Sequence, residues 1–94
     1  MPNRTAMTIA STRHRDQVEP EVAELYEKTR IDLSMLPEIM TAEELALGIR
    51  SSVGALSQDR YLRRGIPYLK LGRRIRYVRA EVAKYLLAVH SSSM

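Results

Sequence analysis

The stretch that most constrains the fold of this chain is residues 60–79, which read RYLRRGIPYLKLGRRIRYVR. It contains seven arginines and one lysine but no acidic residue, and short apolar runs are interleaved with the charges. An ordinary solvated surface mixes both signs, because like charges held close together repel each other. Basic residues in a strand-like alternation therefore predict a folded surface that binds a polyanion, with DNA or RNA as the first candidates.

The composition predicts one small domain whose basic residues lie in its second half. The chain has 94 residues and a formal net charge of +4, and this length allows a single modest hydrophobic core. Residues 1–40 carry five basic and seven acidic side chains, whereas residues 41–94 carry ten and four. There is no cysteine, which excludes disulfides and thiolate zinc sites. No apolar run approaches the roughly 18 residues of a membrane span, and no signal peptide is evident, so we expect a cytoplasmic protein.

The acidic first part is predicted to contain a flexible start, a helix and a linker. Residues 1–18 show no hydrophobic period, and we expect them to be flexible. Over residues 19–40 the pattern predicts a helix from Glu19 to Arg30, followed by a linker. Glu24 and Lys28 form an i,i+4 pair in the favourable order, which supports the helix.

This helix has a narrow apolar side, which consists of Val22, Leu25, Tyr26 and Thr29. So few apolar groups do not keep a helix folded alone, so the stripe must rest on its own domain or on a neighbouring protomer. We favour a protein–protein contact, because an acidic helix is repelled by phosphates. Ile31, Leu33 and Met35 then alternate with polar residues, which predicts a short strand or an extended linker.

A helix-turn-helix is predicted at the start of the compact domain, which we place at residues 41–90. Thr41 and Glu44 form a capping box, so the first helix runs over residues 42–49. A tight turn follows, and Ser52 caps a second helix. Two short helices joined by so short a turn are typical of a helix-turn-helix.

The second helix is expected to end near Arg64, because Gly65 and Pro67 prevent its continuation. A hairpin follows, in which the alternating runs 68–71 and 75–78 surround a turn. In this hairpin we expect Lys70 and Arg76 to face outward, and Leu69, Leu71, Ile75 and Tyr77 to face inward.

The rest of the pattern completes a winged helix-turn-helix. A last helix is predicted over residues 80–89, where apolar side chains recur at helical spacing, and residues 91–94 are expected to form a flexible tail. The predicted fold class is therefore mainly α with a small β-hairpin, preceded by an extra N-terminal helix.

Over about residues 40–89 the chain resembles the excisionase-type branch of the MerR-like winged-helix family. The residues that carry the resemblance are Thr41, Glu44, Ser52, Leu56, Arg60, Gly65, Pro67, Lys70, Gly72, Arg73, Arg74, Arg76, Tyr77 and Glu81. The chain departs from the family pattern at Asp59, where related sequences often carry a tryptophan, and at Gly48 inside the first helix. We expect Asp59 to pair with Arg63 or to orient a base-contacting arginine, and Gly48 to allow a close approach between helices.

The resemblance implies a phage excisionase, or recombination directionality factor, acting at the bacterial nucleoid. Such a protein binds repeated sites in an attachment region of double-stranded DNA, bends the DNA and helps an integrase to excise the prophage. Self-association or cooperative neighbours on DNA are expected, and no small-molecule effector is expected because the chain stops near His90. The alternatives are a small transcriptional regulator at a promoter or operator, and an interaction module whose basic face binds an acidic partner.

The DNA-binding residues are expected on the second helix and the hairpin, and they are Ser52, Ser57, Gln58, Arg60, Tyr61, Arg63, Arg64, Lys70, Arg73, Arg74 and Arg76. The second helix is expected to enter the major groove, where Gln58 can pair with adenine. Arg73 and Arg74 at the hairpin tip are expected to contact phosphates or a minor groove. The alternative for Arg63 and Arg64 is that they satisfy the C-terminal dipole of their helix.

The sequence gives little support to an enzyme or to a metal or cofactor site. His14 and His90 lie near the two ends of the chain, without a third ligand or a positioned carboxylate. No glycine-rich phosphate loop or nucleophile elbow occurs. We therefore expect no catalysis, no cofactor and no bound metal.

Overall fold

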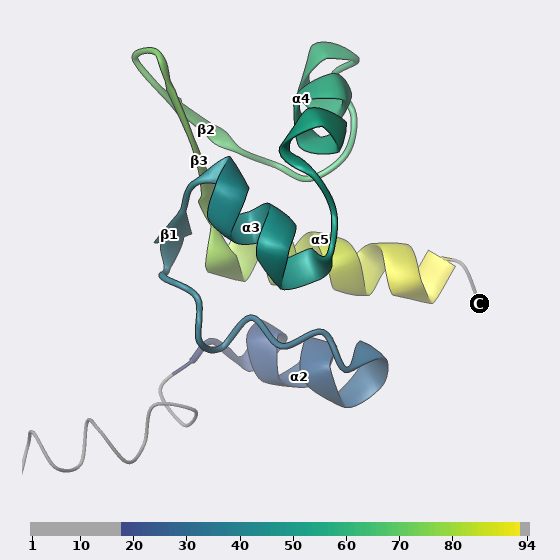
Figure 1. Cartoon of the computed structure of the whole chain (residues 1–94). Coiled ribbons are helices and arrows are strands. Elements are labelled where there is room, and N and C mark those ends of the chain that lie inside the picture. Colours follow the sequence, from purple (N-terminus) through teal and green to yellow (C-terminus); the bar gives the residue numbers. More distant parts are fainter. Residues whose placement is uncertain (1–17, 93–94) are drawn as a thin grey trace, which may run out of the picture.

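The computed structural model describes residues 18–92, and over these residues the chain is mainly α with a small antiparallel sheet (Figure 1). In chain order the elements are α2 (Pro20–Thr29), β1 (Ile39–Met40), α3 (Ala42–Ile49), α4 (Val53–Tyr61), β2 (Leu69–Leu71), β3 (Arg74–Val78) and α5 (Arg79–Ser92). The flexible start expected over residues 1–18 thus lies outside the described residues except for Val18. Of the expected tail, Ser91 and Ser92 instead belong to α5, which extends beyond its predicted end at residue 89, and residues 93–94 lie outside the described residues. None of the helices in the described part is long and apolar enough to cross a membrane.

The helices begin where the sequence predicts. Pro20 occupies the first turn of α2. The Thr41 hydroxyl accepts the N–H of Glu44 at 3.1 Å, and the Glu44 carboxylate accepts the N–H of Thr41 at 2.9 Å. At the start of α4, Ser52 Oγ accepts the N–H of Ala55 at 3.0 Å. These side chains satisfy N–H groups that have no partner inside a helix, so the predicted caps of α3 and α4 are confirmed.

Three helices are followed by an arginine in the left-handed conformation, which the sequence does not signal. The φ angles are 69° at Arg30, 58° at Arg50 and 57° at Arg63. After α4, the N–H of Arg64 donates to the carbonyl of Asp59 at 2.9 Å, a hydrogen bond typical of a Schellman motif. This motif ends α4 at Tyr61, earlier than the predicted end near Arg64.

The three strands form one sheet in the order β1-β3-β2, with both pairs antiparallel. Strand β1 adds an edge that the sequence does not predict, because two residues are too short to show an alternating pattern. In it Met40 lies opposite Tyr77 and Ile39 lies opposite Val78. The central strand β3 therefore joins the linker after α2 to the hairpin.

The prediction for the faces of the hairpin is right for β3 and wrong for β2. Cross-strand partners in an antiparallel pair share a face of the sheet, and Lys70 lies opposite Ile75. Lys70 is therefore on the face that carries Ile75 and the buried Tyr77. Leu69 and Leu71, which we expected to face inward, are on the other face and are exposed.

The turn of the hairpin is tighter than the sequence suggests. Arg74 already belongs to β3, so only Gly72 and Arg73 form the loop. Gly72 has a φ of 65°, and a positive φ at the first of two loop residues is typical of a type II′ turn. A Cβ at Gly72 would meet no atom within 4 Å, so backbone conformation rather than space favours glycine here.

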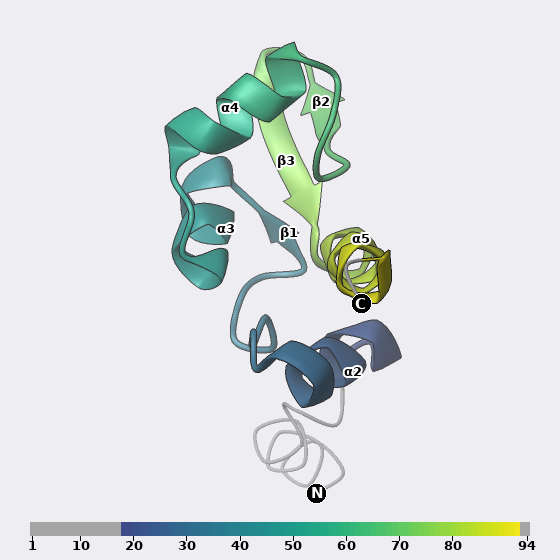
Figure 2. The ribbon, with the colours of Figure 1, turned by 90° about the vertical axis from the view of Figure 1, so that its right-hand side faces the viewer.

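One hydrophobic core joins α2 to the rest of the described chain. Its buried members are Val22, Leu25, Leu33, Met40, Ala42, Leu45, Ala46, Leu56, Ile66, Tyr77, Val82 and Ala83. Val22 and Leu25 are fully buried, and α2 packs beside α5 (Figures 1 and 2). The apolar stripe of α2 is therefore covered by its own domain and needs no neighbouring protomer. A protein–protein contact through the exposed side of α2 stays a prediction.

Residues 31–36, in the first part of the linker after α2, form no strand, and this segment packs against α3. Leu33 in this linker is fully buried. Gly48 of α3 faces the same segment, because a Cβ there would lie 2.6 Å from Cδ1 of Leu36. The close approach that we predicted for Gly48 is therefore to the linker and not to another helix.

Arg79, the last arginine of the basic stretch, is buried and only 5 % exposed. Its guanidinium donates to the two carboxylate oxygens of Glu19 at 2.9 and 3.4 Å, and to the carbonyls of Ser34 and Leu36. The carboxylate of Glu38 lies 3.9 Å away. A buried guanidinium is tolerated when its charge and its N–H groups are partnered. Arg79 therefore ties the segment before α2, the linker and α5 together.

The ion pair of Glu19 makes the stability of the fold depend on pH. Burial by itself raises the pKa of Glu19, but the hydrogen bond from Arg79, a backbone hydrogen bond and the charge of Arg79 hold the pKa below its ordinary value of 4.5. A lowered folded-state pKa gives a contribution that is complete above the unfolded-state value and is lost as the pH falls through the folded-state value.

We therefore expect the free energy of unfolding to fall as the pH decreases from about 5 to about 3. The Glu19→Gln variant, which lacks the titrating group, should show a smaller fall. Urea unfolding followed by circular dichroism at several pH values measures both. Equal falls in the two proteins would show that Glu19 is not the group responsible.

Candidate nucleic-acid interface

Helix α4 and the β2–β3 hairpin project from the same end of the molecule. Figure 1 shows both above α5, with α2 below α5. Figure 2, turned by 90°, again places α4 and the hairpin at one end and α2 at the other. The two elements that were predicted to contact DNA are thus neighbours in space.

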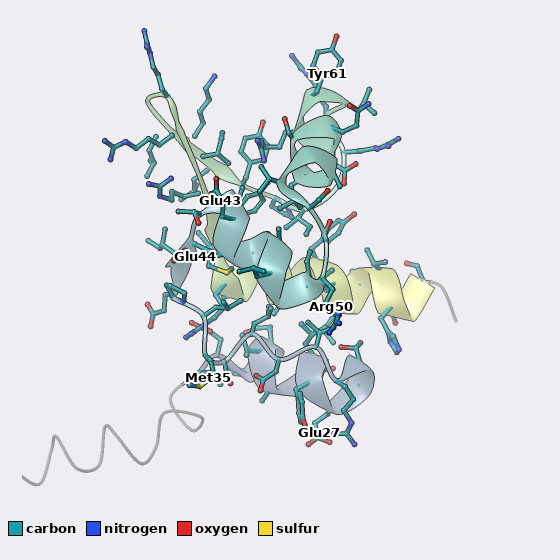
Figure 3. All side chains as sticks on the ribbon, viewed as in Figure 1. Glu27, Met35, Glu43, Glu44, Arg50 and Tyr61 are labelled. Atoms are coloured by element: carbon teal, nitrogen blue, oxygen red, sulfur yellow. The ribbon has the colours of Figure 1, made fainter. Side chains whose placement is uncertain are left out.

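Helix α4 rests on the core through Leu56 and presents its other sides to solvent. Ser57 and Gln58 are exposed. Tyr61 is 82 % exposed and lies at the outer end of the helix (Figure 3). Val53, in the first turn of α4, is also exposed. The polar side chains predicted to contact DNA on α4 are therefore accessible.

Arg60 joins α4 to the hairpin. Its Nη1 donates to the hydroxyl of Tyr77 at 2.6 Å. Its Cζ atom lies 5.8 Å from the ring centroid of Tyr68 and 6.0 Å from that of Tyr77, within the range of cation–π attraction. Because Tyr77 is buried in the core, this cluster fixes the position of α4 relative to β3. The predicted DNA contact of Arg60 stays a prediction, to which the structure adds a positioning role.

Asp59 pairs with Arg64 and not with Arg63. Its Oδ1 lies 3.2 Å from Nε of Arg64. This exposed pair contributes little stability, but it restricts where the Arg64 guanidinium points. Gly65 follows with a φ of 87°, and a Cβ there would lie 2.9 Å from Oδ2 of Asp59. The loop after α4 thus folds back closely on Asp59. Position 65 requires glycine both because of its positive φ and because a side chain there would collide with Asp59.

The outer part of the hairpin carries unpaired positive charge. Lys70, Arg73 and Arg74 are exposed, and the hairpin contains no acidic residue. Arg76, nearer the base, is half-buried and donates to the carbonyl of Ile75 at 2.8 Å. Beside the hairpin, the end of α4 and the following loop form a shallow depression whose lining includes Arg60, Arg63 and Arg64. This end of the molecule is therefore suited to anions such as phosphates.

Arg63 was predicted either to contact DNA or to satisfy the C-terminal dipole of α4. Its left-handed backbone conformation allows these two roles to be tested separately. Glycine adopts this conformation without strain, so Arg63→Gly and Arg50→Gly should each raise the free energy of unfolding by up to about 1 kcal/mol. Figure 3 places Arg50 at the end of α3 that points away from Tyr61. We expect Arg63→Gly to weaken duplex binding severalfold and Arg50→Gly to leave it unchanged. Urea unfolding and fluorescence anisotropy with a labelled duplex measure the two effects, and equal binding by both variants would leave Arg63 with a helix-end role only.

The sequence prediction placed Leu69 and Leu71 inside, and it therefore missed Leu71, next to the hairpin turn, as a candidate contact. A two-residue turn at Gly72 and Arg73 would have predicted this exposure from the sequence. It sets Leu71 opposite Arg74, and this register fixes which face of the sheet each leucine occupies. Of the two histidines, His14 lies outside the described residues and His90 is in α5. Among residues 18–92 no group of three or more potential metal-ligating side chains occurs.

Comparisons of the chain with family models, with curated proteins and with solved structures found no match.

Proposed function

We propose that this chain is a winged helix-turn-helix protein that binds and bends double-stranded DNA as an accessory factor in site-specific recombination. In this proposal α3 and α4 form the helix-turn-helix, the β2–β3 hairpin is the wing, and α2 is the extra N-terminal helix. The protein binds repeated sites in an attachment region and directs an integrase toward excision of phage DNA. The observation that carries the proposal is that the exposed polar face of α4 and the basic hairpin tip lie at one end of the molecule.

The two elements suit the two grooves of a duplex. An α-helix fits the major groove, where an amide side chain such as Gln58 can pair with the edge of adenine. A narrow basic hairpin such as the one that carries Arg73 and Arg74 suits phosphates and the minor groove. The Arg60 cluster holds both elements in one arrangement, so that both can engage the same stretch of DNA.

The distribution of charge favours an orientation in which α4 and the hairpin face the DNA over one in which α2 faces it. Glu24 and Glu27 of α2 are exposed, and Figure 3 shows Glu27 at the end of the molecule farthest from Tyr61. Phosphates approaching this acidic end are repelled, whereas those approaching the hairpin are attracted. The acidic end stays clear of the DNA in this orientation, which leaves it accessible to an integrase or to a neighbouring copy.

A recombination assay with purified integrase tests the proposed role. The substrate carries the attachment sites, and the reaction is run with and without this protein. We expect the protein to be required for excision and to suppress integration. Equal excision with and without it would contradict the recombination role, and binding to a single palindrome that overlaps a promoter would support the alternative of a small transcriptional regulator.

Gln58 tests whether α4 is the element that distinguishes base sequence. The Gln58→Ala variant should bind the cognate duplex more weakly by about 1–3 kcal/mol, because a bidentate pair with adenine is lost. Binding to random-sequence DNA, which depends on phosphate contacts, should change little. Titrations of both duplexes by fluorescence anisotropy measure the difference, and equal losses on the two would mean that α4 does not read the bases.

A further inference from the structure

The tip of the hairpin carries an apolar side chain among its cations. Leu71 is the last residue of β2, lies opposite Arg74 and is 55 % exposed. Its chain neighbours include Lys70 and Arg73, which are also exposed. In Figure 1 the hairpin extends beyond α3 as a narrow projection. Leu71 is thus exposed next to the turn of a narrow projection, on the face of the sheet opposite to Tyr77.

We propose that Leu71 is a wedge that inserts from the minor groove between two base pairs and kinks the duplex. This inference rests on the proposed function, since it requires that the hairpin bind duplex DNA. Proteins that bend DNA from the minor groove often insert one apolar side chain between base pairs, while basic residues contact the phosphates beside it. Leu71 and its neighbours Arg73 and Arg74 have this combination of side chains.

A base-pair step fits this tip better than a protein partner does. A stable protein–protein interface buries roughly 800 Å² on each partner, which two short strands and a two-residue turn do not offer at their tip. A duplex needs only the narrow tip itself, because the wedge contributes through one side chain and its flanking charges. The absence of acidic residues from the hairpin agrees with the negative charge of the groove.

Leu69 provides a matched control on the same face of the same strand. It is 42 % exposed, but it lies at the base of the hairpin, where Pro67, Tyr68 and Val78 line an apolar groove with it. A leucine in this position is too far from the tip to insert between base pairs. The wedge therefore predicts different effects for two substitutions that remove the same chemical group.

The test uses a duplex selected by the wild-type protein from a random-sequence library. Single mismatches are placed at each position of the selected site in turn. A mismatch at the wedge position should tighten wild-type binding by about tenfold, because a weakened step is easier to unstack. Leu71→Ala should lose this gain, whereas Leu69→Ala and Leu71→Met should keep it. The bend, measured by energy transfer between dyes at the two ends of the duplex, should decrease only in Leu71→Ala.

The outcomes separate the wedge from the proposed function. If Leu71→Ala keeps both the mismatch gain and the bend, the wedge is overturned while DNA binding stands. An equal loss in Leu69→Ala or in Leu71→Met also overturns it, because the effect would not depend on an apolar group at the tip. If the wild-type protein selects no duplex, the proposed function fails and the wedge fails with it.

Discussion

Reversal of Arg73 and Arg74 to glutamate should lower the affinity for every duplex sequence by about 100-fold near 0.1 M salt. Both side chains are exposed at the hairpin tip, where they are placed to neutralise phosphates. Each phosphate contact releases counterions and contributes roughly 0.9 to the slope of log affinity against log salt concentration. The loss of two contacts should therefore reduce this slope by about 1.8. Because phosphates carry no sequence information, cognate and random duplexes should weaken alike.

The measurement is a set of anisotropy titrations at several salt concentrations. The matched control is the double variant Lys28→Glu and Lys84→Glu, which changes the net charge equally at exposed positions on α2 and α5. We expect this control to weaken binding only slightly, through the general field of the protein. If the hairpin variant has an unchanged slope, or if the control loses as much affinity, the hairpin does not contact phosphates.

Replacement of Arg79 by methionine should reduce the free energy of unfolding by about 3 kcal/mol. The variant leaves the carboxylate of Glu19 without its main partner, and it removes the hydrogen bond that Arg79 donates to the part-buried carbonyl of Leu36. A domain of this size has a total stability of only about 5–15 kcal/mol. Urea unfolding followed by circular dichroism should therefore show a clear shift of the midpoint to lower urea.

Binding measurements on the same variant separate Arg79 from the other arginines of the basic stretch. Under conditions in which Arg79→Met stays folded, we expect its affinity for duplex DNA to match that of the wild type, because Arg79 is buried. The Arg73 and Arg74 double variant should show the opposite pattern, with weak binding and unchanged stability. A stable Arg79→Met protein that binds DNA poorly would contradict the structural role.

Local patterns in the sequence are sufficient for most of the helix starts and for the presence of the hairpin. The Thr41–Glu44 capping box and the Ser52 cap depend on residues three positions apart, so the sequence contains all the information that they require. The sequence predicts the C-terminal ends of the helices less well. Arg30, Arg50 and Arg63 occupy a conformation for which glycine is the usual signal. The end of α4 was therefore placed too late.

The sequence also predicted which types of residue make up the candidate site, because a run of like charges is a property of the sequence alone. The prediction that α4 and the hairpin tip carry accessible polar and basic side chains agrees with the exposure of Gln58, Tyr61, Arg73 and Arg74. Their contact with DNA stays a prediction. What the sequence did not show is which basic residues are structural, since Arg79 and Arg73 have the same chemistry.

Only the tertiary structure decided that Arg79 is internal, because its partner Glu19 is 60 residues away in the chain. The sequence also did not determine that α2 packs on α5. A narrow apolar stripe requires a covering surface but does not specify which segment provides it. The outward position of Leu71 was settled by its pairing with Arg74. The sequence alone thus determined the elements and their charge, through interactions between near neighbours. Packing and strand register decided which side chains are buried and which are free to bind, because both depend on contacts between distant segments.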